Sequence, residues 1–155
     1  MPQVFLDCDG VLADFDRGAA AILGMHPREF ERRHGMGQFW KKLAAVPDFF
    51  NILEPLADAD ELFEAVRHLE PIILTGLPRG KWAEPQKRRW AARHFPGTPV
   101  ITTSAALKYQ HCRPGDVLVD DRSTYRHLWE GAGGIFIHHH AAAQSVAALR
   151  SVGVL

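Results

Sequence analysis

Short apolar runs that end in a polar residue recur along the chain and indicate buried strands. Residues 4–6 (VFL) precede Asp7, residues 71–74 (PIIL) precede Thr75, and residues 117–119 (VLV) precede Asp120. Residues 99–101 (PVI) and 135–137 (IFI) are two further candidates. Because none of these runs alternates apolar with polar positions, each predicts a strand that is covered on both faces, as in a parallel sheet.

Segments with helical spacing lie between the strand candidates. Residues 58–69 begin with a capping-box pattern from Asp58 to Glu61 and continue with apolar residues at helical spacing. Pro85 is expected to open a second helix, Ser123 to cap a third, and residues 141–152 to form a fourth. Strands that alternate with helices predict right-handed βαβ units. We therefore expect an α/β fold, a three-layer Rossmann-like parallel sheet.

Residues 17–57 interrupt this alternation. The segment follows the first strand candidate but contains no strand pattern of its own, and glycines and prolines punctuate it. Short helices fit between these breaks, and they would carry the aromatic residues Phe30, Phe39, Trp40, Phe49 and Phe50. We predict a small helical cap over residues 17–57, inserted into a core formed by residues 1–16 and 58–155.

Composition and charge limit the classes of partner. Hydrophobic residues make up 46% of the chain and charged residues 23%, as in ordinary globular proteins. Lysine plus arginine equals aspartate plus glutamate at 18 each, so nothing overall favours a nucleic-acid polymer or a membrane surface. Two cysteines, Cys8 and Cys112, are too few for a disulfide scaffold, and the first residues show no signal-peptide pattern. We expect a cytoplasmic protein with a small-molecule partner, and the pattern does not predict its oligomeric state.

Acidic residues follow two of the strand candidates. Asp7 and Asp9 are two positions apart in an extended segment and therefore face the same side, and Asp120 and Asp121 follow a later strand. The carboxyl ends of parallel strands share one edge of the sheet, where ligands bind. Thr75 ends a third strand at the same edge. Crowded carboxylates repel one another, and a hard divalent cation relieves that repulsion. Oxygen-only ligands favour Mg²⁺ over zinc.

Such a site contains the groups that phosphoryl transfer needs. A carboxylate can act as the nucleophile and form an aspartyl-phosphate. A second acid can protonate the leaving oxygen and then activate water. A metal ion and a lysine can neutralise the charge on the transferred group.

Four segments in order resemble the motifs of the haloacid dehalogenase superfamily. Residues 7–15 (DCDGVLADF) resemble the first motif, residues 73–76 (ILTG) the second, and residues 118–122 (LVDDR) the fourth, while Lys108 suits the third. Within that superfamily the chain looks most like the 5′(3′)-deoxyribonucleotidases, whose features include the DxDGVLADF run, the Phe39–Trp40 pair and the VDDR ending.

This resemblance implies a role for each matching position. Asp7 would be the nucleophile and Asp9 the general acid and base. Mg²⁺ would be held by Asp7, the main-chain carbonyl of Asp9, and Asp120 or Asp121. The phosphate group of a nucleoside monophosphate would be bound by Thr75, Gly76 and Lys108. The pocket for the nucleobase would be lined by Phe15, Phe39 and Trp40. Lys87 is a further candidate for the substrate pocket, as a second phosphate contact.

Several alternatives remain open at this point. The chain is shorter than the animal deoxyribonucleotidases that it resembles, with a reduced cap, and Gly-Leu-Pro follows Thr75 where those enzymes usually carry serine and proline. A sugar phosphate or phosphoglycolate is therefore an alternative substrate. A phosphoacceptor receiver domain uses a similar acidic cluster, but in a different order along the chain, and an inactive relative would only bind. Phe39 and Trp40 also suit a purely structural cap core. We expect residues 138–140 (HHH) to form a solvated loop rather than a metal site.

Overall fold

The computed structural model describes all 155 residues and contains one five-stranded sheet. All neighbouring strands pair in parallel, in the order β3-β2-β1-β4-β5. The strands are β1 (Val4–Leu6), β2 (Ile72–Gly76), β3 (Val100–Thr103), β4 (Val117–Asp120) and β5 (Ile135–His138). Each of the five predicted strands is confirmed, and so is the parallel arrangement.

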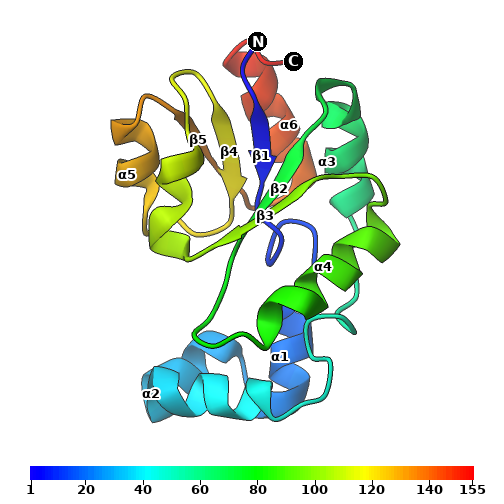
Figure 1. Cartoon of the computed structure of the whole chain (residues 1–155), viewed down its shortest axis with the longest axis vertical. Helices are drawn as coiled ribbons and strands as arrows, with labels where there is room; N and C mark the ends of the chain where they lie inside the picture. Colours follow the sequence, from blue (N-terminus) through cyan, green and yellow to red (C-terminus); the bar gives the residue numbers. More distant parts are fainter.

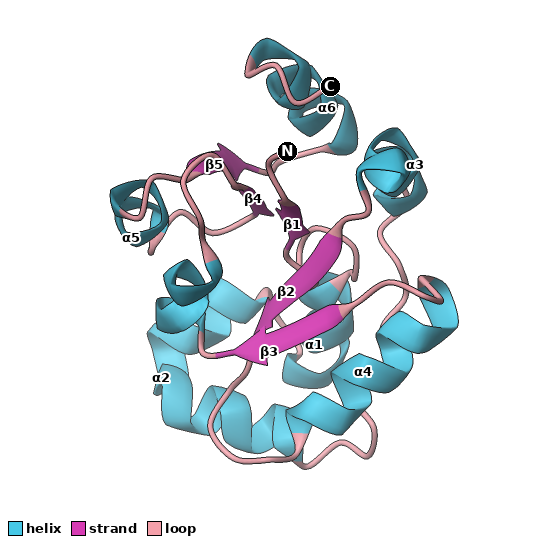
Figure 2. Cartoon of the chain, turned by 45° about the horizontal axis from the view of Figure 1, so that its top comes forward, coloured by secondary structure: helices cyan, strands magenta, loops and turns pink.

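Helices cover both faces of the sheet (Figure 2). They are α1 (Phe15–Leu23), α2 (Pro27–Ala44), α3 (Ala59–Val66), α4 (Ala83–His94), α5 (Arg126–Gly131) and α6 (Ala142–Ser151), with 3₁₀ helices η1 (Arg67–Leu69) and η2 (Ala105–His111). No helix of the molecule combines the length and the apolar composition that a membrane span requires.

Successive strand residues point into two separate cores, which makes the molecule three-layered. Val4 and Leu6 belong to the larger core, which contains residues of α3, α4 and α6 and continues into α1 and α2. Phe5, between them, points to the opposite face. The smaller core there consists of Phe5, Leu74, Leu118, Trp129 and Phe136. Continuous apolar strands are what a sheet covered on both faces requires.

Two of the predicted helix caps are wrong. Asp58 precedes α3 but makes no side-chain hydrogen bond to it. Its Oδ2 instead accepts from the main-chain N–H of Ala142, at 2.7 Å, and so satisfies the first turn of α6. Ser123 does not cap α5, which begins at Arg126 after Tyr125. Pro85 is the third residue of α4 rather than its first. The Asp58 carboxylate thus acts across a tertiary contact that local sequence does not record.

Helices α1 and α2 lie at the end of the molecule toward which the strands run (Figure 1). Residues 17–57 contain no strand, and α2 bends at Gly35, whose φ of 82° lies outside the helical region. The predicted boundary between residues 16 and 17 falls inside α1. The cap helices therefore cover the carboxyl edge of the sheet, where the acidic residues are.

The chain that leaves these helices is attached to α4. The amide of Phe50 donates to Gln86 Oε1 at 2.9 Å, and the Trp90 indole N–H donates to the carbonyl of Leu53 at 2.8 Å. Arg89 forms an ion pair with Asp48 at 2.6 Å. Residues 48–53 are therefore fixed to a helix of the sheet's outer layer.

Candidate active site

The loop after β1 turns sharply and brings two strand ends together. Gly10 has a φ of +81°, and a Cβ atom there would lie 2.1 Å from Oδ2 of Asp121. Only glycine allows both that backbone conformation and that approach. The loop is closed by main-chain hydrogen bonds from Leu12 and Ala13 to the carbonyl of Cys8. Local sequence does not indicate this contact, because it joins Gly10 to a residue more than 100 positions away.

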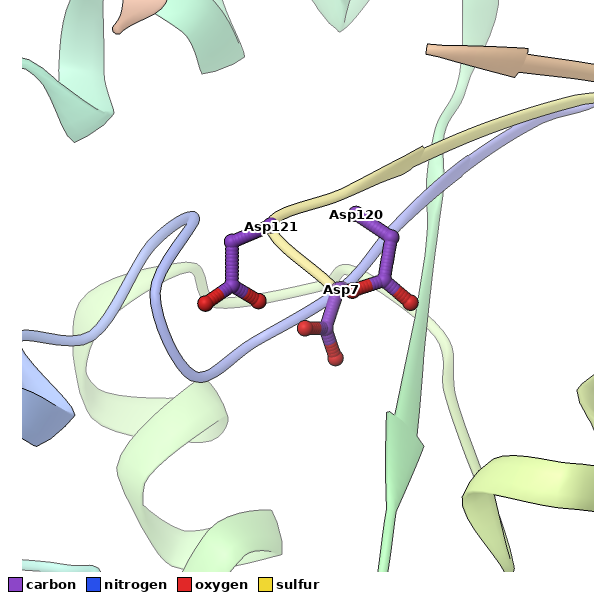
Figure 3. Close-up of side chains that lie close together, drawn as sticks. All are labelled: Asp7, Asp120 and Asp121. Carbon is purple, nitrogen blue, oxygen red and sulfur yellow. The ribbon is translucent and has the colours of Figure 1, made fainter. Parts of the chain in front are cut away.

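Three carboxylates meet at this turn (Figure 3). Asp7 directly follows β1, Asp120 ends β4, and Asp121 comes next after it. Each offers one carboxylate oxygen within 4.8 Å of the others. Lys108 reaches them from η2 and donates to Asp7 Oδ1 at 2.8 Å and to Asp120 Oδ2 at 3.0 Å. Gly76 helps to place η2, because a Cβ atom there would lie 3.2 Å from the Cβ and amide nitrogen of Ala105.

The pKa values of the three acids in this cluster are shifted to different extents. Burial acts to raise the pKa of Asp7, but the charge and hydrogen bond of Lys108 outweigh it and hold that pKa below its ordinary value. Burial and the negative charge of Asp7 raise the pKa of Asp120 to about 6. The same two causes raise the pKa of Asp121 to about 9. One lysine therefore does not balance three crowded carboxylates.

A second lysine organises the other side of the site. Lys87, from α4, is 3% exposed and donates to Asp9 Oδ2 at 2.7 Å, to Thr75 Oγ1 at 2.9 Å and to the carbonyl of Gly76 at 2.9 Å. Its ammonium group also lies 4.6 Å from the ring centroid of Phe50. The Thr75 hydroxyl is thus bonded to Lys87. The structure places both motif residues of β2 around this lysine.

Asp9 is held by one of its two carboxylate oxygens. Oδ2 accepts from Lys87, whereas Oδ1 is buried without a hydrogen-bond partner. Burial raises the pKa of Asp9, and the charge of Lys87 only partly opposes that effect. Asp7 and Asp9 therefore lie two residues apart with pKa values shifted in opposite directions.

The acidic cluster has the donor set of a hard-cation site. All three side chains offer only oxygen, and the repulsion that raises the pKa values of Asp120 and Asp121 is what a divalent cation relieves. The Asp9 side chain is not part of this cluster, because Lys87 binds it. Asp7, Asp120 and Asp121 fit Mg²⁺, and the main-chain carbonyl of Asp9 stays a predicted fourth ligand.

A cavity of about 460 Å³ opens above the two acidic residues of the first loop. Its polar wall contains Asp7, Asp9, Lys87 and Lys108, and α1 and α2 contribute Phe15, Phe39 and Trp40. Several lining residues were not predicted from the sequence, among them Leu77, Tyr109, Arg122 and Tyr125. Three of them directly follow predicted site residues, and that adjacency is the only signal that could have found them.

The predicted aromatic residues are exposed to different extents. Phe15 is 6% exposed and lies at the centre of a cluster, with ring centroids about 6 Å from those of Phe39, Trp40, Phe49 and Phe50. Phe39 is 2% exposed, whereas Trp40 is half-buried. Phe15 and Phe39 mainly build the core of the cap segment. Trp40 offers the accessible aromatic surface.

The three consecutive histidines do not form the expected solvated loop. His138 ends β5 and donates from Nε2 to the main-chain carbonyl of Asp121 at 2.9 Å, since a carbonyl can only accept. His139 is buried, and its Nδ1 lies 2.7 Å from Ser145 Oγ. Only His138 and His140 are exposed. The strand extends one residue further than predicted and so turns the middle ring inward.

Comparisons with known proteins agree with this geometry. The model of the family described as "5' nucleotidase, deoxy (Pyrimidine), cytosolic type C protein" matches residues 1–147. A Vibrio phage KVP40 protein named "Putative 5'(3')-deoxyribonucleotidase" is 26% identical over 142 residues, which cover 89% of this chain and 74% of that protein.

Two solved structures share the fold. L-2-haloacid dehalogenase from Xanthobacter autotrophicus superposes with a TM-score of 0.56 at 17% identity, over 88% of this chain and 76% of that one. A HAD hydrolase, family IA, variant 3, from Entamoeba histolytica superposes with a TM-score of 0.50 at 15% identity, over 97% of this chain and 100% of that one. At these identities the likeness shows the fold alone.

Proposed function

The chain belongs to the family of the cytosolic type C deoxy (pyrimidine) 5′ nucleotidases and is a phosphoric monoester hydrolase of the haloacid dehalogenase type, and we propose that it hydrolyses nucleoside monophosphates with Mg²⁺ through a phosphoryl group carried on Asp7. The family decides against the receiver-domain alternative. The observation that carries the mechanism is the pair Asp7 and Asp9, whose surroundings shift their pKa values in opposite directions.

Asp7 has the properties of the nucleophile. Lys108 keeps its carboxylate ionised, and the group lies at the base of the cavity. An Asp7 oxygen attacks phosphorus, the bond from phosphorus to the ester oxygen breaks, and the alcohol leaves. Lys108 is placed to stabilise negative charge on both Asp7 and the phosphoryl group.

Asp9 has the properties of the acid and base. Its raised pKa favours a proton, and its buried Oδ1 has no partner inside the protein. Asp9 gives that proton to the leaving oxygen. It then takes a proton from the water that attacks the phosphorus of the aspartyl-phosphate, so phosphate is released and Asp7 is restored. Lys87 holds Asp9 by its other oxygen and orients it for both steps.

Asp7, Asp120 and Asp121 would hold the Mg²⁺ ion. When bound, it supplies positive charge to the phosphoryl oxygens. The two acids at the end of β4 are themselves positioned by the protein: Asp120 Oδ1 accepts from the amide of Arg122 at 3.0 Å, and His138 donates to the carbonyl of Asp121. The rigid strand ends thus preset the cluster.

The cavity suits a molecule with one anionic end and one flat end. Lysines and carboxylates line one part, and Trp40 with Tyr109 and Tyr125 contributes aromatic surface. A base stacked on an aromatic side chain gains about 1–3 kcal/mol, or roughly 5- to 150-fold in affinity. This favours a nucleotide over a sugar phosphate or phosphoglycolate.

A phosphate-release screen with Mg²⁺ tests this proposal. The panel contains ribo- and deoxynucleoside monophosphates, glucose 6-phosphate and phosphoglycolate, and it is run on the wild type and on Asp7→Asn. We expect the highest kcat/KM for a deoxynucleoside monophosphate and a loss of at least about a thousandfold in the variant. Asp60→Asn, on the exposed start of α3, is the matched control. A higher kcat/KM for phosphoglycolate or glucose 6-phosphate would reject the nucleotidase assignment.

A further inference from the structure

A second cavity, entirely polar, adjoins the catalytic one between the start of α2 and the loop after β4. Its volume is about 410 Å³, and none of its eight lining residues is hydrophobic. It is lined by Arg28, Glu31 and Arg32 of α2, by Asp121, Arg122, Ser123 and Thr124 after β4, and by His138 of β5. Four of these residues, Glu31 and Asp121 among them, also line the catalytic cavity, so the two spaces meet.

Three arginines of this cavity lack a protein counter-charge. None of the side chains of Arg28, Arg32 and Arg122 forms an ion pair, although the cavity also contains Glu31 and Asp121. By contrast Arg33, the next residue on α2, pairs with Glu29 at 2.8 Å. Guanidinium groups present forked donors that match phosphate oxygens. Three unpaired guanidinium groups around one polar space form a binding environment for a phosphate group.

The two walls of this cavity are not joined to each other. No hydrogen bond or ion pair of the structure connects α2 with residues 121–125 or with His138. On the opposite side, α4 fastens residues 48–53 through Gln86, Arg89 and Trp90. The polar side is therefore where a charged part of a bound molecule can extend away from the catalytic centre.

We propose that Arg28, Arg32 and Arg122 form a subsite for a second phosphate group on the substrate. The proposal rests on the proposed function, in which the first phosphate is bound at Asp7. Asp121 lines the second cavity, and its carboxylate lies within 4.8 Å of that of Asp7, so one small molecule can span both sites. The enzyme then favours a nucleotide with two separate phosphate groups, such as a nucleoside 3′,5′-bisphosphate, over the corresponding monophosphate.

Steady-state kinetics with a matched substrate pair test the subsite. The pair is 2′-deoxyuridine 3′,5′-bisphosphate and 2′-deoxyuridine 5′-monophosphate, and the measured quantity is the ratio of their kcat/KM values. We expect a ratio of at least about ten in the wild type, because charge-assisted hydrogen bonds to phosphate are strong. The double variant Arg28→Gln/Arg32→Gln should bring the ratio close to unity and leave monophosphate turnover within about twofold.

Two single variants sharpen this test. Arg33→Gln removes a paired arginine from the same helix outside the cavity and should leave the ratio unchanged. Glu31→Gln removes a negative charge from the cavity and should raise the ratio of the two kcat/KM values. The side chains of Arg28 and Arg32 are exposed and form no hydrogen bond or ion pair, and equal thermal midpoints of the variants verify folding. A wild-type ratio near unity, or an equal loss in Arg33→Gln, overturns the proposal.

Calorimetric binding to the Asp7→Asn protein separates this inference from the proposed function. If the bisphosphate binds with an affinity that depends on Arg28 and Arg32 while no nucleotide is hydrolysed by the wild type, the subsite stands and the proposed function fails. If monophosphates are hydrolysed but the bisphosphate gains nothing, the subsite fails alone. Inorganic phosphate is the third ligand. If inorganic phosphate binds as tightly as the bisphosphate, and this binding depends on Arg28 and Arg32, the cavity is a site for free anions and the proposal is overturned.

Discussion

The Nζ atom of Lys87 lies 2.7 Å from Oδ2 of Asp9, although the two residues are 78 positions apart in the chain. The same ammonium group bonds Thr75 and the carbonyl of Gly76. Lys87 thereby connects the first catalytic loop, the end of β2 and helix α4. We infer that its main role is to orient Asp9, and that any contact with the substrate phosphate comes in addition.

Replacing Lys87 tests that role. Lys87→Gln should lower kcat for a nucleoside monophosphate by about a hundredfold, the scale of general acid and base catalysis, with a smaller change in KM. In the pre-steady state, release of p-nitrophenol should slow less than release of the nucleoside, because p-nitrophenol needs little protonation to leave, whereas hydrolysis of the aspartyl-phosphate is common to both substrates. Lys81→Gln, an exposed lysine, is the control. Equal losses in the pre-steady-state rate of leaving-group release for both substrates would contradict an action through Asp9.

Activity should depend on a divalent cation. We expect EDTA to abolish turnover, and Mg²⁺ to restore it, because three carboxylates crowd together with only Lys108 to balance them. Mn²⁺ should substitute, since it accepts octahedral oxygen ligands. Ca²⁺ should inhibit, because its looser coordination misplaces the nucleophile and the phosphate. Full activity after chelation, measured as phosphate release, would refute the metal-assisted mechanism.

The stability of the metal-free protein should fall with rising pH. The pKa of Asp121 is raised to about 9 from an ordinary value of 3.8, so the folded state binds this proton more tightly than the unfolded state. Between these two values the free energy of unfolding contributed by Asp121 therefore decreases as pH rises.

Denaturation in EDTA at about pH 7 and about pH 8.5 measures this slope above the pKa of Asp120, which is raised to about 6. Asp121→Asn should show a flatter slope than the wild type, and Mg²⁺ should stabilise the wild type most at the higher pH. Equal slopes in the wild type and the variant would show that the proton on Asp121 does not cause the pH dependence of stability.

Much of the fold could be predicted because it depends on local pattern. Continuous apolar runs predicted all five strands, and their parallel pairing placed Asp7, Asp120 and Asp121 at one edge. The cap predicted for α3 failed because Asp58 finds its partner in Ala142, across the tertiary structure. The bond between Lys87 and Asp9 is equally non-local. No spacing rule joins groups whose proximity arises only when α4 packs against the sheet.

The aromatic cap shows where residue type alone was insufficient. Phe15, Phe39 and Trp40 were predicted together as a base pocket, but burial separates them. Phe15 and Phe39 are almost inaccessible, so their packing energy would be lost in any substitution. Trp40 is the residue whose substitution tests recognition with the least damage to the core.

Trp40→Ala should remove most of the preference for a nucleotide. We expect kcat/KM for a deoxynucleoside monophosphate to fall by about tenfold or more, from the loss of stacking, while p-nitrophenyl phosphate changes by less than about tenfold. Phe39→Leu is the comparison, because it alters the cap core and keeps Trp40 in place. A drop shared equally by both substrates would assign Trp40 to the cap core as well.

The central claim is that Asp7 carries the phosphoryl group while Asp9 moves the protons. Asp9→Asn with p-nitrophenyl phosphate isolates it, because this substrate forms the intermediate without acid assistance whereas its hydrolysis needs the base. Rapid acid quench followed by mass spectrometry of the peptide that contains Asp7 is the direct measurement. We predict a burst of p-nitrophenol equal to the enzyme concentration and a phosphoryl group on Asp7. Turnover at the wild-type rate with no burst and no phosphorylated Asp7 would contradict the mechanism.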